Sequence, residues 1–265
     1  MKNYLIKALN QLNQNFYTQI SEDFSASRNF SWQGWIEIIK YLPKKENLKV
    51  LDIACGNGRF VEFLKQNLRG PFSYLGLDNS KSLLKIAQNK FPKYQFKFFD
   101  LIKNYLANEK ITFNTQEKFD LIVSFGLSHH LPSTKLREEF LKSLKNKLRA
   151  NGLIVISNWQ FANEQNRFQK NTLNWKKIIQ NSKINLWQKI SLLYLLLHLE
   201  KNDYLLDWRK GDSAGQVFRY CHHIDEKEIL NIIEKSQLVI IDKFFADGKS
   251  KKLNQYFVLK TNKII

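Results

Sequence analysis

One stretch, residues 48–60, constrains the fold of this 265-residue chain most strongly, and it reads Leu-Lys-Val-Leu-Asp-Ile-Ala-Cys-Gly-Asn-Gly-Arg-Phe. The apolar run 50–53 predicts a buried parallel strand, and the apolar periodicity that begins at Phe60 predicts a helix. Gly56 and Gly58 lie between them, where a missing Cβ lets a ligand approach the backbone and the free N–H groups of the helix start. The stretch therefore predicts a ligand site between a strand and a helix.

The charge of this loop distinguishes among the nucleotides that such turns bind. A dinucleotide site places an anionic pyrophosphate on the helix N-terminus. Here Asp52 ends the strand four positions before Gly56, and Val61 stands where the third glycine of Gly-x-Gly-x-x-Gly is expected. A carboxylate suits a cationic ligand such as S-adenosylmethionine, which carries an ammonium and a sulfonium. The pattern Asp-x-x-x-Gly-x-Gly resembles the first motif of the class I S-adenosylmethionine-dependent methyltransferases; the alternative is a structural turn in another α/β protein.

Acidic residues also end the next two predicted strands. The strand at 72–77 ends in Asp78, about 20 residues beyond the loop, where a carboxylate accepts hydrogen bonds from both hydroxyls of a ribose. The strand at 94–99 ends at Asp100, which the methyltransferase pattern places near the adenine amino group. A fourth strand at 119–125 leads into a loop that contains two adjacent histidines, His129 and His130. Alternating strands and helices predict a parallel sheet covered on both faces, with ligands at the carboxyl ends of its strands.

The order of these segments predicts an α/β, Rossmann-like class I methyltransferase fold, with a seven-stranded, mostly parallel sheet, an antiparallel terminal hairpin and an α-helical insertion after the fifth strand. We expect a single domain over residues 1–265. Its parts are a helical cap at 1–47, a cofactor-binding core at 48–158, a helical insertion at 159–216, and a C-terminal helix and hairpin at 217–265. Other expected elements are helices at 4–16, 32–41, 82–89, 134–148, 184–199 and 225–235, strands at 153–157, 238–245 and 255–260, a turn at Asn151-Gly152, and mainly loop at 102–117.

Composition narrows the class of partner. A net charge of +18 favours polyanions such as RNA, although the joint abundance of Lys, Asn and Ile is also typical of an A/T-rich genome. No apolar run approaches the ~20 residues that span a bilayer, and residues 1–15 lack the apolar centre of a signal peptide. Cys55 and Cys221 alone provide neither a disulfide framework nor a zinc site. We expect a cytoplasmic protein with no membrane partner and no bound metal.

Four further segments narrow the family. They are Tyr17 to Arg28 (Tyr-x-x-Ile-x-x-x-Phe-x-x-x-Arg) with Trp32, Ser124 to Leu131 with His129-His130, Trp159-x-x-x-x-Glu164-Gln165, and Arg219-Tyr220-Cys221-His222. In this order they resemble the tRNA wobble-uridine carboxymethyl methyltransferases, which comprise the fungal-type enzyme and the domain fused to an AlkB-type hydroxylase in animals. The resemblance implies tRNA as a partner, and it raises a small zinc-containing activator subunit as a second one. Cys221 in place of a tyrosine, and Trp208-Arg209 in place of Val-Pro-Trp, leave the RNA substrate open.

The charged residues of these segments also bear on the acceptor. An amine or a ring carbon must lose a proton and needs a base, whereas a carboxylate with a pKa of about 4 is already ionised and needs cationic groups that hold it. The chain lacks the Asn/Asp-Pro-Pro-Tyr loop of amino-group methyltransferases after the fourth strand. It offers cationic and imidazole groups instead, namely Arg28, His129, His130, Arg219 and His222. This inventory favours an acid, so the reaction that we expect is methyl esterification of a carboxymethyl-modified wobble uridine.

The pattern and the resemblance together give a set of candidate site residues. Those expected to hold S-adenosylmethionine are Tyr17, Arg28, Trp32, Asp52, Gly56, Asn57, Gly58, Asp78, Asn79, Asp100, Leu101, Ser124, Phe125 and His129. Those expected to act on the acceptor are Arg28, His129, Trp159 and Arg219.

Alternatives remain open at this point. Arg28 and Trp159 also suit structural roles, and Arg219 and His222 suit ion pairs with Glu226 or Glu228. Two other functions fit the same pattern. One is a methyltransferase for a small carboxylate or a quinone-type molecule, and the other is a non-catalytic, RNA-binding subunit with the methyltransferase fold.

Overall fold

The computed structural model describes residues 1–265 except 27–29, 164, 209–214 and 263–265. Arg28, Glu164 and Arg209, which the sequence analysis names, therefore lie outside the described residues. So do the side chains of Gln165 and its neighbours up to Arg167.

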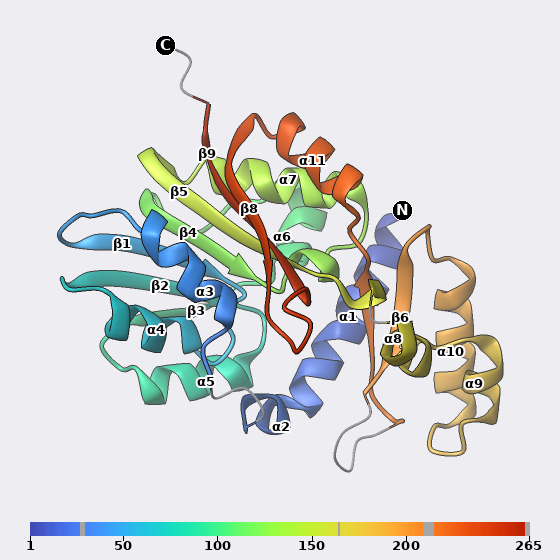
Figure 1. Ribbon diagram of the computed structural model, residues 1–265. Helices are drawn as coiled ribbons and strands as arrows, with labels where there is room; N and C mark the ends of the chain where they lie inside the picture. The colour runs from blue at the N-terminus through green and yellow to red at the C-terminus, as the bar shows by residue number, and fades with distance from the viewer. Residues whose placement is uncertain (27–29, 164, 209–214, 263–265) are drawn as a thin grey trace.

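A seven-stranded sheet forms the centre of the molecule, in the order β3-β2-β1-β4-β5-β9-β8 (Figure 1). Its strands are β1 (Leu48–Ile53), β2 (Phe72–Asp78), β3 (Gln95–Phe98), β4 (Phe119–Phe125), β5 (Leu148–Trp159), β8 (Leu238–Ala246) and β9 (Asn254–Thr261). The first five are parallel, and β9 runs antiparallel to both of its neighbours. The predicted sheet and terminal hairpin are confirmed. Since β1 lies between β2 and β4, the order reverses there, and a crevice is expected at the carboxyl ends of these strands.

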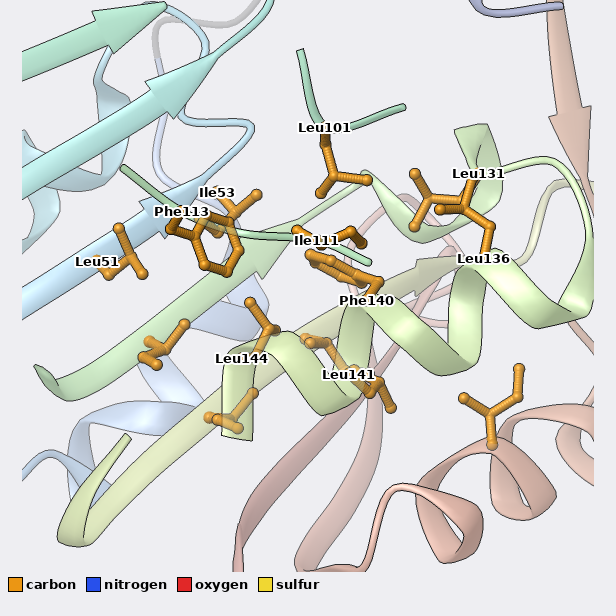
Figure 2. Close-up of a cluster of buried hydrophobic side chains, with 14 of the residues drawn as sticks. Leu51, Ile53, Leu101, Ile111, Phe113, Leu131, Leu136, Phe140, Leu141 and Leu144 are labelled. Atoms are coloured by element: carbon orange, nitrogen blue, oxygen red, sulfur yellow. The ribbon is translucent and has the colours of Figure 1, made fainter. Parts of the chain in front are cut away.

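Helices cover both faces of this sheet. They are α1 (Asn3–Gln19), α2 (Ser21–Ala26), α3 (Gln33–Ile38), α4 (Arg59–Asn67), α5 (Lys81–Lys90), α6 (Leu101–Asn108), α7 (Thr134–Lys145) and α11 (Glu226–Lys235), with a short 3₁₀ turn at Ile39–Tyr41. Alternate residues of a strand face opposite sides. Leu51 and Ile53 therefore pack with α7 in the core of Figure 2, whereas Val50 packs with α3 and α4 on the other face.

The insertion after β5 contains helices and one strand of a second sheet. Its elements are a 3₁₀ turn (Phe161–Asn163), α8 (Gln165–Asn171), α9 (Trp175–Gln180), α10 (Leu186–Leu197) and β6 (Asp203–Asp207). β6 pairs antiparallel with β7 (Phe218–His222), so a two-stranded sheet joins the predicted insertion to the predicted C-terminal part. This sheet was not predicted from the sequence. It packs on α1, where the Tyr220 N–H donates to Asn13 Oδ1 over 2.7 Å.

Two local predictions were wrong. Residues 102–117 were expected to be mainly loop, but α6 begins directly after Asp100, whose carboxylate caps it by accepting from the Lys103 N–H over 2.9 Å. Asn151-Gly152 was expected to be a turn, but both residues lie inside β5. Asn151 has a φ of 64°, and the β4–β5 register shifts between Phe119 and Leu121. The turn-forming pair therefore accompanies an irregularity in the β4–β5 pairing and does not reverse the chain.

Within the described ranges, every helix falls short of the length and hydropathy that a bilayer crossing requires.

Candidate active site

A cavity of about 700 Å³ lies at the carboxyl ends of β1, β2 and β4, a volume within the range of small-molecule sites. Its walls come from the loops that follow these strands and from several other parts of the chain, among them α1, β7 and the turn after β8. The predicted cofactor-binding and acceptor residues that line it are Tyr17, Trp32, Gly56, Asn57, Asp78, Asn79, Leu101, Phe125, His129, Trp159 and Arg219. Residues separated by some 200 positions in the chain thus share one cavity.

The two glycines of the loop after β1 have different roles. Gly56 and Gly58 have φ values of 56° and 77°, a backbone conformation that favours glycine. A Cβ on Gly56 would meet nothing closer than Leu83 at 4.0 Å, so space remains beside the cavity. A Cβ on Gly58 would lie 3.1 Å from Phe91 and 3.2 Å from Phe96. Gly58 is absent from the described cavity lining, and its role is to let α4 pack against these rings.

Asp78 is the carboxylate that this loop presents to the cavity. Its Oδ2 accepts from the Gly56 N–H and its Oδ1 from the Ser80 N–H, each over 2.8 Å. Burial raises the pKa of Asp78, while the hydrogen bonds that it accepts from the backbone oppose the rise. Each carboxylate oxygen has a second lone pair. Asp78 is thus positioned to accept two hydroxyl donors from a ligand in the cavity.

Asp52 lies beneath the loop, and the described lining of the cavity does not include it. Because side chains alternate along a strand, Asp52 shares the face of Val50, and Tyr74 Oη donates to its Oδ2 over 2.6 Å. Burial raises the pKa of Asp52 to about 7, against the lowering effect of the Tyr74 hydrogen bond. The expectation that Asp52 faces the ligand directly is corrected by this geometry.

Asp100 and Ser124 are also outside the described lining. Asp100 is occupied by α1: Asn10 Nδ2 donates to its Oδ1 over 3.1 Å, and Gln14 Nε2 donates to its Oδ2 over 2.7 Å. It therefore fastens α1 to the start of α6. Ser124 is fully buried within β4.

Three of the four residues predicted to act on the acceptor come together in the wall of the cavity. The guanidinium carbon of Arg219 lies 4.6 Å from the centroid of the Trp159 ring, and the Trp159 ring lies 5.4 Å from that of His129. Arg219 also lies over Phe16, at 5.0 Å. We call Arg219, Trp159 and His129 the acceptor cluster. It presents a cation and an imidazole beside an aromatic wall.

His130, the second member of the double histidine, holds the surrounding elements together. Tyr17 Oη lies 2.7 Å from its Nε2, and the Tyr220 carbonyl oxygen lies 2.9 Å from its Nδ1. The atoms of His129, His130 and Cys221 that could bind a metal ion lie within 4.8 Å of one another. Since both ring nitrogens of His130 already face these partners, we assign His130 a structural role.

His222 lies outside the described lining and belongs to a buried ionic network. Its Nδ1 lies 2.6 Å from Asp203 Oδ1, and its Nε2 lies 2.8 Å from Glu228 Oε2. Arg137 also binds Glu228, over 2.6 Å. The structural alternative that paired His222 with Glu228 is therefore confirmed, whereas Arg219 packs on aromatic rings.

Some lining residues were missed because nothing in the local sequence marks them. Asp247 and Lys249 come from the turn between β8 and β9, and Asn254 is the first residue of β9, far along the chain from the glycine loop. Arg59 directly follows the motif, and its guanidinium carbon lies 5.4 Å from the centroid of the Trp32 ring. Arg59 could have been predicted as a lining residue because it directly follows the glycine loop.

Comparison with known families and curated proteins gives the following. Residues 51–154 match the family model described as a methyltransferase domain. The mitochondrial methyltransferase OMS1 of Saccharomyces cerevisiae is 28% identical over 82% of this chain and 46% of its own length. The tRNA (carboxymethyluridine(34)-5-O)-methyltransferase of the same yeast is 24% identical over 54% of this chain and 46% of its own length. The ubiquinone/menaquinone biosynthesis C-methyltransferase UbiE of Campylobacter jejuni is 25% identical over 57% of this chain and 62% of its own length. The chain thus spans about half the length of the first two.

Solved structures share the fold. An S-adenosylmethionine-dependent methyltransferase from Clostridium acetobutylicum matches with a TM-score of 0.55 and 16% identity, over 94% of this chain and 98% of that one. The putative methyltransferase in complex with the Trm112 methyltransferase activator of Haloferax volcanii matches with a TM-score of 0.59 and 11% identity, over 95% and 98% of the two chains. Such similarity establishes the architecture.

Proposed function

From the premise that this chain has the class I methyltransferase fold, with a methyltransferase domain at residues 51–154, we propose that it transfers a methyl group from S-adenosylmethionine to a carboxylate. The acceptor that we propose is the carboxymethyl group of a wobble uridine in tRNA, which would become a methyl ester. The observation that carries the proposal is the acceptor cluster, where a cationic guanidinium lies beside the cavity that the glycine loop helps to form.

The residues that line the cavity fit S-adenosylmethionine. The space beside Gly56 leaves room for a ligand against the backbone of the loop. The oxygens of Asp78 suit the two ribose hydroxyls, and the apolar side chains of Leu83, Phe99 and Ile102 suit the faces of an adenine. When bound, S-adenosylmethionine supplies a methyl group that its sulfonium makes electrophilic.

The chain itself contributes positioning. Methyl transfer is an in-line displacement, which is accelerated chiefly by holding the two reacting atoms close and aligned. A carboxylate needs no general base, so the task of Arg219 is to hold one acceptor oxygen by a charge-assisted hydrogen bond while the other oxygen attacks. Trp159 holds the guanidinium plane in place and excludes water, which strengthens that interaction.

Further support comes from the rest of the chain and from its relatives. The net charge of +18 favours the approach of a polyanion such as tRNA. A relative with 24% identity is named for carboxymethyluridine methylation, although this chain covers only 46% of it. The similarity to a methyltransferase in complex with Trm112 supports a small activator subunit as an additional partner.

The test is nucleoside mass analysis of carboxymethyluridine-containing tRNA after incubation with the purified protein and S-adenosylmethionine, with and without an added Trm112-type activator. We expect a new nucleoside that is heavier by one methylene and that alkali converts back to the acid. If no ester forms with the activator present, the tRNA acceptor is excluded, while cofactor binding remains a separate measurement.

A small carboxylate or quinone-type acceptor is the second candidate. The similarity to UbiE supports it, as does the apolar share of the cavity wall, which includes Leu127, Leu131 and Phe125. Methylation of a free aliphatic acid without RNA, at a rate insensitive to salt, would favour this candidate, because tRNA binding weakens steeply as salt rises.

A further inference from the structure

Large apolar side chains are exposed on the outer face of α10, at the edge of the molecule formed by α9 and α10 (Figure 1). Leu186 is 69% exposed, Trp187 78% and Leu197 82%. Ile190 and Tyr194 lie between them and are also exposed. Residues 187, 190, 194 and 197 recur at helical spacing, so they form one stripe along the helix. We call Leu186, Trp187, Ile190, Tyr194 and Leu197 the α10 face.

The α10 face belongs to a firmly packed helix. Leu192 and Leu195, on the inner side of α10, are buried in a cluster with Leu9 and Tyr220. The helix begins with a capping box, in which the Asn185 side chain accepts from the Gln188 N–H and the Gln188 side chain accepts from the Asn185 N–H, each over 2.9 Å. The cap and the buried inner side therefore hold α10, and with it the exposed apolar residues of the α10 face, in a fixed position.

Positive charge accompanies this face. From residue 174 to residue 199 the chain contains Lys176, Lys177, Lys183 and Lys189 and no aspartate or glutamate. Lys176 lies over the exposed ring of Trp175, with Nζ 5.4 Å from its centroid. The next acid, Glu200, pairs with the N-terminal ammonium over 2.8 Å. Lys177 and Lys189 donate to the backbone oxygens of Thr172 and Ile179, whereas Lys176 and Lys183 are exposed. The partner of this end of the molecule must therefore accept apolar side chains beside positive charge.

We propose that the α10 face binds the surface of an anionic lipid bilayer. A helix of 12 residues is too short to span a membrane but suits the interface, where apolar side chains enter the acyl boundary and lysines meet the headgroups. Tryptophan and tyrosine are the residues that favour this depth. The lysines disfavour a second copy of this chain, because two copies would bring like charges together. RNA would present phosphates to leucine and isoleucine, which offer them no hydrogen bond.

This inference departs from the expectation of no membrane partner, and it does not depend on which acceptor is methylated. Among the described residues that line the cavity, none comes from α9 or α10. The lipid surface would thus hold the chain by one end and leave the glycine loop accessible.

The test is sedimentation of the full chain with vesicles of phosphatidylcholine mixed with phosphatidylglycerol, and with vesicles of phosphatidylcholine alone. We expect binding to the anionic vesicles that weakens as salt rises. The double variant W187S/L197S should bind at least about tenfold more weakly, because it removes the two most exposed side chains of the face. The matched control is I36S/F98S, which removes two exposed apolar side chains from α3 and β3; its binding should equal that of the wild type.

Circular dichroism of both variants verifies the fold, since all four side chains are at the surface. The proposal is overturned if the wild type ignores anionic vesicles or if W187S/L197S binds them as tightly as the wild type. It is also overturned if light scattering without lipid shows a dimer that W187S/L197S abolishes, or if the loss in this variant is of tRNA binding instead, measured by filter retention.

Discussion

The guanidinium of Arg219 lies over the indole ring of Trp159, 4.6 Å from its centroid, at the wall of the cavity. The two residues come from β7 and from the end of β5, in different sheets. Their contact joins the two-stranded sheet to the central sheet where an acceptor would enter. The proposed acceptor site depends on this contact.

Replacing Arg219 with leucine should lower kcat/KM for the carboxylate acceptor by roughly a hundredfold, because one charge-assisted hydrogen bond is worth about 1.5–3 kcal/mol. Arg219→Lys should recover only part of this loss, since an ammonium does not stack on an indole as a guanidinium does. Affinity for S-adenosylmethionine should stay unchanged in both. Arg69→Leu, at an exposed position, is the matched control. Equal kinetics for Arg219→Leu and this control would contradict the assignment of Arg219 to the acceptor.

Gly58→Ala should destabilise the protein by about 1–3 kcal/mol, because alanine disfavours a φ of 77° and its methyl group would press on Phe91 and Phe96. Gly70→Ala is the matched control: no atom lies within 4 Å of a Cβ placed there, so it should change stability by less than about 0.5 kcal/mol. Urea denaturation followed by circular dichroism measures both. Indistinguishable midpoints would show that the loop tolerates a side chain at residue 58.

Asp52 should make the protein less stable as pH rises. Its pKa is raised by burial to about 7 in the folded chain, against about 3.9 in an unfolded one. Proton binding therefore favours the folded state, and stability falls as the pH rises from about 4 through about 7. Asp52→Asn keeps an acceptor for the Tyr74 hydroxyl without the charge.

The Asp52→Asn variant should therefore be more stable than the wild type at pH 8, by on the order of 1–3 kcal/mol, and its stability should vary less between pH 4 and pH 7. Chemical denaturation at several pH values provides the comparison. A variant whose stability follows the same pH curve as the wild type would show that Asp52 is ionised without cost.

The stability that the His222 network contributes should fall both as pH rises and as pH falls. Burial lowers the pKa of His222, but its hydrogen bonds with Asp203 and Glu228 outweigh burial and raise it overall. Stability from this group is present below the ordinary histidine pKa of about 6.5 and is lost as pH rises through the raised value. Burial raises the pKa of Glu228, yet the His222 hydrogen bond and the Arg137 charge bring it down to about 2. That contribution is lost as pH falls from about 4.5 towards 2.

We call the loss of stability at rising pH the alkaline limb and the loss at falling pH the acid limb. His222→Gln should remove the alkaline limb. The acid limb should persist in part, because Arg137 still faces Glu228. Thermal unfolding at a series of pH values measures both limbs. His198→Gln, at an exposed site on the end of α10, is the matched histidine control. An alkaline limb that survives in His222→Gln would assign that limb to another group.

The positions of the strands along the chain and their parallel direction could be predicted because each of β1, β2 and β4 is a short apolar run followed by turn residues and then by helical periodicity. Such local patterns also placed Gly56, Asp78 and His129 at strand ends, where a parallel sheet gathers ligand residues. The β6–β7 sheet could not be predicted in this way. Leu205 and Leu206 lie in a run too short to distinguish from a helix end, and their partner strand β7 begins only at Phe218.

The depth of each acidic side chain in the site was the part that sequence could not supply. Asp52 pairs with Gly76 in the β1–β2 register, so Asp78 lies two residues further along the sheet. Asp52 is therefore buried beneath the loop beside Tyr74, while Asp78 lines the cavity. Asp100 was predicted to end the third strand, but β3 ends at Phe98 and Asp100 caps α6, with its oxygens bound by Asn10 and Gln14 of α1. These contacts are long-range, and no spacing within the motif encodes them.

The most direct test of the central claim, that this cavity holds S-adenosylmethionine through Asp78, is calorimetric titration of the cofactor into the purified chain. The wild type should bind one equivalent. Asp78→Asn should bind at least about tenfold more weakly, because a neutral amide replaces an acceptor of two hydroxyl donors, and Glu46→Gln, an exposed control, should match the wild type. An absence of binding to the wild type, or equal affinity of Asp78→Asn and the control, would contradict the account.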